Sequence, residues 1–119
     1  MEEIIENSKG GKQTKIDGKM TEVPPEALLL ISSVMGEGSV RYPREENGSP
    51  NWYKISCMSN LDHAMRHAAI FLRYRNELGL VPEEVRNSML QDMREELSHF
   101  AARAMMALEQ WERDEIEGD

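Results

Sequence analysis

The stretch REELSHFAARAMM, residues 94–106, decides the fold. Apolar residues recur in it at intervals of three and four, and neither proline nor glycine interrupts the pattern. That spacing predicts an amphipathic helix. We expect the helix to begin at Val81–Pro82, because proline is tolerated in a first helical turn, and to run to about Glu112. The expected apolar face comprises Met89, Met93, Leu97, Phe100, Ala104, Leu108 and Trp111.

A first helix is expected upstream, where Val23–Pro24–Pro25–Glu26 has the residues of a helix start. It continues through ALLLISSVM and is predicted to stop at Gly36 or Gly38, since glycine commonly ends helices. This segment is apolar nearly all round. We therefore expect it to be buried.

A second helix is expected to begin near Ser56 or Ser59, either of which is a suitable N-cap, and to end at Gly79. The segment before it, residues 39–57, has two prolines and two asparagines and is predicted to be a long, functional loop. No stretch shows a convincing strand pattern, and no internal repeat is present. The predicted fold class is all-α, a small bundle of three main helices.

The chain is expected to divide into three parts. Residues 1–22 are predicted to be an irregular polar arm, residues 23–112 a helical catalytic domain, and residues 113–119 an acidic, fraying tail. Three helices in one chain of 119 residues bury little by themselves. The very apolar first helix and the long third helix favour a homodimer or homotetramer in which subunits share a core.

Composition excludes several functions. The net charge of −8 argues against binding to a nucleic-acid backbone, although a metal ion can still pair a phosphorylated ligand with an acidic site. No apolar run is long enough to span a membrane, and the acidic start is not a signal peptide. The single cysteine, Cys57, suits a reducing cytoplasm.

A polar seam borders the apolar face of the third helix. Asp92, Glu96, His99 and Arg103 fall at i, i+4, i+7 and i+11, while Glu95 lies further toward solvent. Carboxylates beside a core can hold hard divalent cations in a cleft. The alternative is a set of exposed ion pairs on a solvated helix face, and spacing alone favours that alternative.

The second helix has a comparable arrangement. Its apolar stripe is expected to face the core, with Asp62 and Arg66 along the border. His63 and His67 are spaced so that two imidazoles can share a metal, but they point away from that stripe, so surface or packing roles are favoured. The stripe comprises Met58, Leu61, Met65, Ala68 and Leu72.

Three blocks of the chain stand out: GKMTEVPPEALLLISSVMGEGSVRYP, the Asn51–Trp52 pair and LDHAMRHAAIFL. In this order they resemble the phage dATP/dGTP diphosphohydrolase family, and the likeness resumes at Ser98–His99. The family is similar to the MazG-like all-α nucleoside triphosphate pyrophosphohydrolases, which hold Mg²⁺ or Mn²⁺ with acids from ExxE and ExxD helix motifs. Here Glu96-Leu-Ser-His99 resembles the second motif, with His in place of Asp, and Asp62 is the best match to the first.

The resemblance implies a metal-dependent enzyme that cleaves a purine dNTP, dGTP ahead of dATP, to the monophosphate and pyrophosphate with about two or three metal ions. Glu96 and His99 become the candidate catalytic residues. The implied metal ligands are Asp62, Asp92, Glu95, Glu96 and His99. The implied substrate-binding residues are Arg66, Arg103, Lys12 and Lys15 for phosphate and Trp52 and Asn51 for the base.

The resemblance also implies a biological role. MazZ-type phage enzymes supply dGMP for synthesis of 2-aminoadenine nucleotides, which places this chain in the cytoplasm of an infected host cell. Two alternatives remain. The chain could be a helical phage adaptor whose acidic faces bind a basic partner, or an HD-type phosphohydrolase, prompted by Asp62–His63 but with the motif order reversed.

Overall fold

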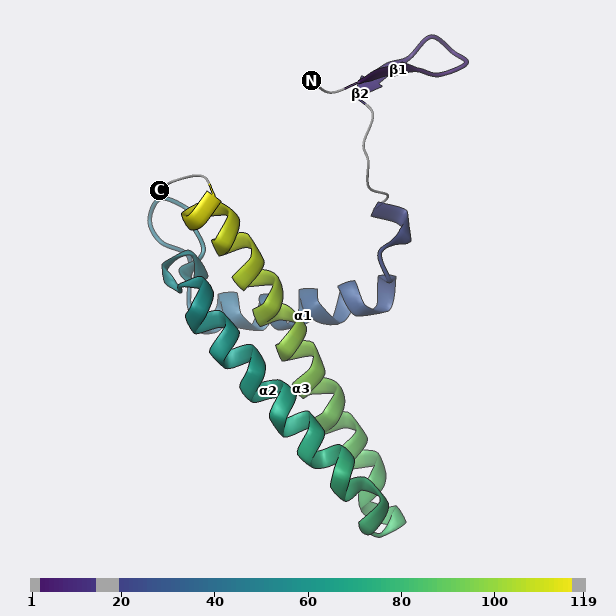
Figure 1. Cartoon of the computed structure of the whole chain (residues 1–119), viewed down its shortest axis with the longest axis vertical. Helices are drawn as coiled ribbons and strands as arrows, with labels where there is room; N and C mark the ends of the chain where they lie inside the picture. The colour runs from purple at the N-terminus through teal and green to yellow at the C-terminus, as the bar shows by residue number, and fades with distance from the viewer. Residues whose placement is uncertain (1–2, 15–19, 117–119) are drawn as a thin grey trace.

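The computed structural model describes residues 3–14 and 20–116 and confirms the all-α fold class. Its three long helices are α1 (Pro25–Arg41), α2 (Cys57–Glu77) and α3 (Glu83–Gln110). Figure 1 shows α2 and α3 side by side along most of their length, with α1 crossing behind α3. Short helical turns lie at Met20–Glu22 (η1), Asn51–Lys54 (η2), Leu78–Leu80 (η3) and Trp111–Ile116 (η4).

The arm is not wholly irregular, and the expectation of no strand is wrong there. Strands β1 (Ile4–Glu6) and β2 (Lys12–Thr14) pair antiparallel, with Ile5 opposite Gln13. The side-chain oxygen of Asn7 accepts hydrogen bonds from the backbone N–H groups of Lys9 and Gly11, both at 2.9 Å, which closes the turn. Strands of three residues are too short to give an alternating pattern, so the sequence did not reveal them.

Helix α1 does not stop at Gly36 or Gly38, as the sequence predicted, but runs to Arg41. Glycine in a helix interior costs only about 1 kcal/mol relative to alanine, which neighbouring turns can offset. The end comes just before Pro43, where the Tyr42 N–H donates to the Gly38 carbonyl at 2.8 Å. The loop that follows is therefore shorter than predicted.

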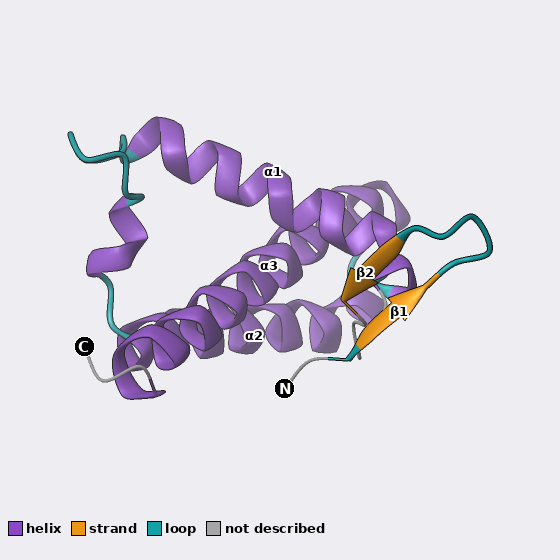
Figure 2. Cartoon of the chain, turned by 90° about the horizontal axis from the view of Figure 1, so that it is seen from above, coloured by secondary structure: helices purple, strands orange, loops and turns teal. Residues whose placement is uncertain are grey.

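The expectation that α1 is buried is also wrong for a single chain. None of its residues is buried, and large apolar side chains such as Leu29 and Val40 are exposed. Figure 2, which looks down from above, shows that α1 lies along one side of the α2–α3 pair. One side of α1 contacts α3, and the apolar side chains on its other sides stay exposed in the single chain.

Helices α2 and α3 form an antiparallel pair joined by η3 and a short turn. Ser56 caps α2 as predicted: its hydroxyl accepts from the Ser59 N–H at 3.1 Å. Helix α3 begins after Pro82, also as predicted. The buried residues of the described chain are Asn60, Ala64, Met93, Ala102, Met106, Ala107 and Gln110.

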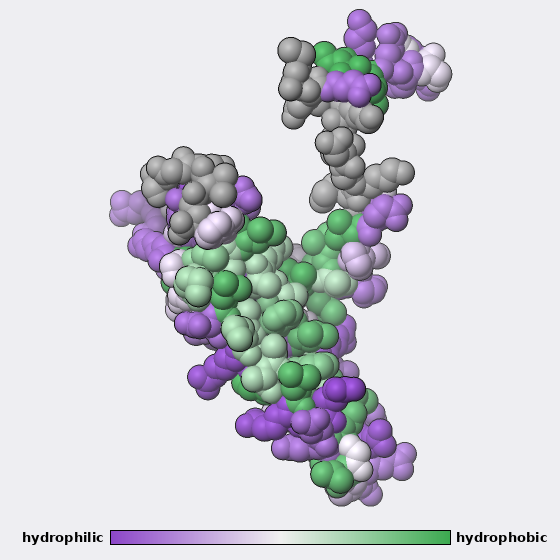
Figure 3. Space-filling model, viewed as in Figure 1, coloured by the Kyte–Doolittle hydropathy of each residue, from purple (hydrophilic) through white to green (hydrophobic). Residues whose placement is uncertain are grey.

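The apolar stripe of α2 does not face the core of the single chain. Met65 is 68% exposed, and Met58, Leu61 and Leu72 are exposed with it. The side that meets α3 carries Asn60, Ala64 and His67 instead. Asn60 and His67 hydrogen-bond to Arg103 and Glu96 of α3, and Ala64 is buried. Figure 3 shows apolar residues gathered over the middle of the α2–α3 face, with hydrophilic residues toward the lower end.

Part of the predicted apolar face of α3 is likewise exposed, including Leu97, Leu108 and Trp111, whereas Met93 is buried. None of the helices in the described ranges is both long and apolar enough to cross a membrane. The division of the chain at residues 22 and 112 stays a prediction.

Candidate active site

The interface of α2 and α3 contains a hydrogen-bonded carboxylate and imidazole. His67 Nδ1 lies 2.6 Å from Glu96 Oε2, and each side chain is 23% exposed. Because an ionised carboxylate only accepts hydrogen bonds, Nδ1 carries the proton and donates it. Both positions lie on the facing sides of their helices, so partial burial removes competing water and holds the Glu96 carboxylate in one orientation.

His99 lies against the same pair. Its ring stacks on His67 with centroids 5.0 Å apart and planes inclined by 28°. Glu96 and His99 are one turn apart on α3, which places both on the side that His67 meets. The two candidate catalytic residues predicted from the sequence are therefore brought together, with His67 as an addition.

Arg103 continues this row one turn further along α3. Its guanidinium donates to Asn60 Oδ1 at 3.1 Å, and Asn60, fully buried, donates in turn to the Ser56 carbonyl at 3.2 Å. No carboxylate of the described chain forms an ion pair with Arg103. A half-buried arginine without an acidic partner, in a chain of net charge −8, can bind an anion.

The remaining predicted metal and phosphate ligands do not join this cluster. Asp62, Arg66, Asp92 and Glu95 are exposed on α2 and α3. Lys12 is exposed in the hairpin, and Lys15 lies outside the described residues. The row of polar side chains along α3 thus begins at Glu96 rather than at Asp92.

The donor groups of one chain do not fit a Mg²⁺ or Mn²⁺ centre in this arrangement. Within residues 3–14 and 20–116, no three His, Cys, Asp or Glu side chains come close enough to hold a metal. Such ions take about six ligands, chiefly oxygens. Glu96 offers one carboxylate, already hydrogen-bonded to His67, beside two imidazoles.

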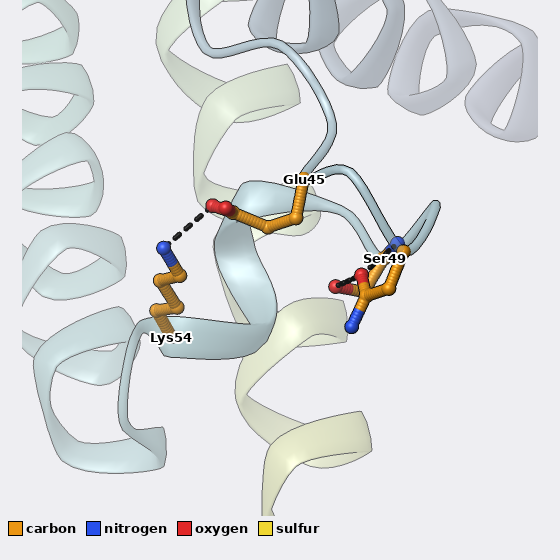
Figure 4. A network of polar contacts seen from close by, with 4 residues as sticks. Glu45, Ser49 and Lys54 are labelled. Atoms are coloured by element: carbon orange, nitrogen blue, oxygen red, sulfur yellow. Dashed lines mark hydrogen bonds and ion pairs between the residues drawn. The ribbon is translucent and has the colours of Figure 1, made fainter.

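The loop between α1 and α2 is held in one shape by its own polar contacts. Lys54 forms an ion pair with Glu45 at 2.6 Å, and Ser49 hydrogen-bonds to Asn47 through both its N–H and its hydroxyl (Figure 4). The Asn47–Gly48 turn needs a positive φ of 87° at the glycine. These contacts shape the loop that leads into η2, which carries Asn51 and Trp52.

Gln110 of α3 hydrogen-bonds to η2 and to the residue that follows it. It is 1% exposed and donates to the backbone carbonyls of Tyr53 and Ile55 at 2.8 and 2.9 Å. The Arg113 guanidinium lies 3.7 Å from the centroid of the Tyr53 ring. The position of the aromatic pair Trp52–Tyr53 is therefore determined by α3 as well as by the loop.

Sequence patterns missed Asn60 and Gln110, and they placed His67 away from the core. The signal was present: Asn60, Ala64 and His67 are spaced at i, i+4 and i+7, as residues on one helix face are. They were passed over because a neighbouring stripe is more hydrophobic, and the more hydrophobic stripe was assigned to the core.

The sequence profile of the dATP/dGTP diphosphohydrolase N-terminal domain matches residues 7–119. The match begins within the hairpin turn, covers all three helices and includes every residue of the polar row. No curated protein and no solved structure matches the chain.

Proposed function

Because the chain belongs to the dATP/dGTP diphosphohydrolase family, hydrolases that act on phosphoric anhydrides, we propose that it cleaves dGTP in preference to dATP at the α2–α3 interface. The products are the deoxynucleoside monophosphate and pyrophosphate. The observation that carries the proposal is the row Glu96, His99, Arg103. In it a positioned carboxylate precedes an arginine that has no acidic partner among the described residues.

In the proposed reaction, the oxygen of a water molecule attacks the α-phosphorus. The bond from that phosphorus to the α,β-bridging oxygen breaks, and pyrophosphate leaves with the electron pair. Glu96 is the proposed acceptor of the proton of the attacking water, and the contact with His67 at Oε2 leaves its Oε1 atom for this role. Arg103 compensates the negative charge that builds up on the phosphate oxygens.

The proposed cofactor is Mg²⁺ or Mn²⁺, with about two or three ions bound, because divalent metals neutralise the negative charge of a triphosphate. The acids of the described residues do not converge in one chain, and we propose that the ligands beyond Glu96 and His99 come from a second copy or from the phosphates. Asp62, Asp92, Glu95, Glu96 and His99 remain the proposed protein ligands. Arg66, Lys12 and Lys15 remain proposed phosphate contacts, and Asn51 a proposed base contact.

The exposed apolar faces support the proposal of a homo-oligomer. Met65 and Leu72 on α2, and Leu97 and Leu108 on α3, present apolar stripes that monomers seldom expose. A second α2–α3 pair packed against them would complete a four-helix core. We propose a dimer or tetramer built in this way.

The proposed biological role is to supply dGMP during phage infection, on the route to 2-aminoadenine nucleotides. The competing proposal is a non-enzymatic adaptor that binds a basic partner through acidic helix faces. The two are separated by incubating the protein with each dNTP and either metal and measuring pyrophosphate. An enzyme of the proposed kind releases it from dGTP first, and an adaptor releases none.

A further inference from the structure

A recess lies between η2 and the C-terminal part of α3, outside the Glu96 cluster. It has a volume of about 190 Å³ and is lined by Trp52, Tyr53, Met105, Met106 and Glu109. The Trp52 and Tyr53 rings meet edge to face at 88° with centroids 4.8 Å apart. Two aromatic and two thioether side chains therefore line the recess beside one carboxylate, that of Glu109.

The size and lining of the recess suit one flat ring system. Pockets that hold a whole small-molecule ligand measure roughly 300–1,000 Å³, so this recess accommodates a fragment of a nucleotide rather than all of it. Nucleobases stack on aromatic side chains regardless of sequence, and methionine adapts to a flat apolar face. A base is the part of a dNTP that these walls match.

The recess is already formed in the single chain. Gln110 holds the Tyr53 carbonyl to α3, and Arg113 covers the Tyr53 ring. Gln110 is buried, so these contacts are shielded from water. Binding would then require little ordering of the walls.

The recess is connected to the proposed catalytic row by helix geometry. Met106, Arg103, His99 and Glu96 follow one another along α3 at steps of three and four residues, which is one helix face. The rise from Met106 to Glu96 is about 15 Å at 1.5 Å per residue. Arg103 therefore lies between Met106 and Glu96 along the same face of α3.

Glu109 supplies the polar contact at the rim. It is exposed, and no residue in the described part of the chain forms an ion pair with it. A carboxylate only accepts hydrogen bonds. The pairing edge of guanine carries two adjacent donors, N1–H and the 2-amino group, whereas adenine presents a donor beside the N1 lone pair.

We propose that this recess is the nucleobase subsite and that Glu109 selects guanine by accepting both of its edge donors. Adenine offers it one donor and one repelling lone pair. The proposal rests on the proposed function and adds the residue that sets base preference within it.

The first test compares kcat/KM for dGTP, dITP and dATP. The wild-type protein is expected to prefer dGTP, then dITP, which lacks the 2-amino donor, then dATP. Glu109→Gln is expected to lower the dGTP-to-dATP ratio about tenfold, because an amide can both donate to and accept from adenine. Glu112→Gln, at an exposed position outside the recess, is the matched control and should leave the ratio unchanged.

The second test measures base binding without catalysis. The chain has two tryptophans, so Trp111→Phe leaves Trp52 as the only indole reporter. Titration with dGMP is expected to quench Trp52 fluorescence at lower concentration than dAMP does, and Glu109→Gln should remove that difference.

The base subsite and the proposed hydrolase activity can be rejected separately. Hydrolysis of dGTP with an unchanged ratio in Glu109→Gln and no quenching of Trp52 would overturn the base subsite and leave the activity standing. Quenching by dGMP without hydrolysis of any dNTP would support the subsite and reject the proposed function. A change in oligomeric mass rather than selectivity in Glu109→Gln would make the recess a subunit contact and overturn the subsite.

Discussion

His67 on α2 and Glu96 on α3 are joined by a 2.6 Å hydrogen bond although 29 residues separate them in sequence. The contact connects the two helices through polar groups at a position where helix pairs usually carry apolar ones. Partly buried polar pairs contribute little net stability compared with apolar packing. Their presence here is consistent with a catalytic use of the interface.

Glu96→Gln is expected to reduce pyrophosphate release from dGTP by about 100-fold or more, because the amide cannot accept the proton of the attacking water. The amide oxygen still accepts from His67, so helix content and unfolding midpoint should stay close to wild type. Glu112→Gln is the control for loss of one negative charge. Near-normal turnover in a folded Glu96→Gln protein would show that this carboxylate is structural.

His99→Asp is expected to retain metal-dependent turnover and to shift the preferred ion from Mn²⁺ toward Mg²⁺, since carboxylate oxygen suits the harder ion better than imidazole nitrogen. The measurement is the ratio of rates with the two metals at saturating concentration. His99→Asn is the companion variant and should cost about 10- to 100-fold if His99 only orients its neighbours. An unaltered metal ratio in a folded, active His99→Asp protein would place His99 outside the site.

Light scattering is expected to give a mass of at least twice the chain mass of 13.7 kDa at micromolar concentration. Met65→Lys should lower that mass, because a lysine on the exposed α2 stripe interrupts apolar packing between copies. Arg75→Lys, an exposed position at the end of α2 that keeps its charge, is the control. A monomer mass for the wild-type protein would contradict the shared core.

Gly36→Ala and Gly38→Ala are each expected to raise the free energy of unfolding by about 0.5–1 kcal/mol, because α1 runs through both glycines. Apart from the adjoining residues and the backbone of the same helix turn, no heavy atom lies within 4 Å of an added Cβ at either site. Gly48→Ala should instead lower the free energy of unfolding by about 1 kcal/mol, since φ at Gly48 is 87°. Denaturant unfolding at one protein concentration measures all three, and destabilisation by both helix substitutions would mean that α1 ends earlier.

The helices could be predicted because capping residues and prolines act locally. Ser56 and Pro82 mark helix starts whatever packs around them, and both predictions are confirmed. The end of α1 was misjudged because a glycine weakens a helix without having to stop it. The prediction of which side of α2 faces the core was also wrong. Met65 and Leu72 belong to the more hydrophobic stripe, yet they are exposed in the single chain.

The candidate site was predictable only where its residues are neighbours on one helix. Glu96, His99 and Arg103 could be grouped by spacing along α3. His67 and Asn60 contact them from another helix, and such pairings depend on the orientation of α2, which one sequence does not reveal. Pairing across helices is therefore where the structure added most.

The most direct test of the proposed reaction is to hydrolyse dGTP in water enriched in the heavy oxygen isotope and to find which product carries the label. Attack at the α-phosphorus predicts label in dGMP, unlabelled pyrophosphate and equal amounts of the two products. Label in pyrophosphate, release of deoxyguanosine with triphosphate, or no turnover by a helical, folded protein with either metal would contradict it.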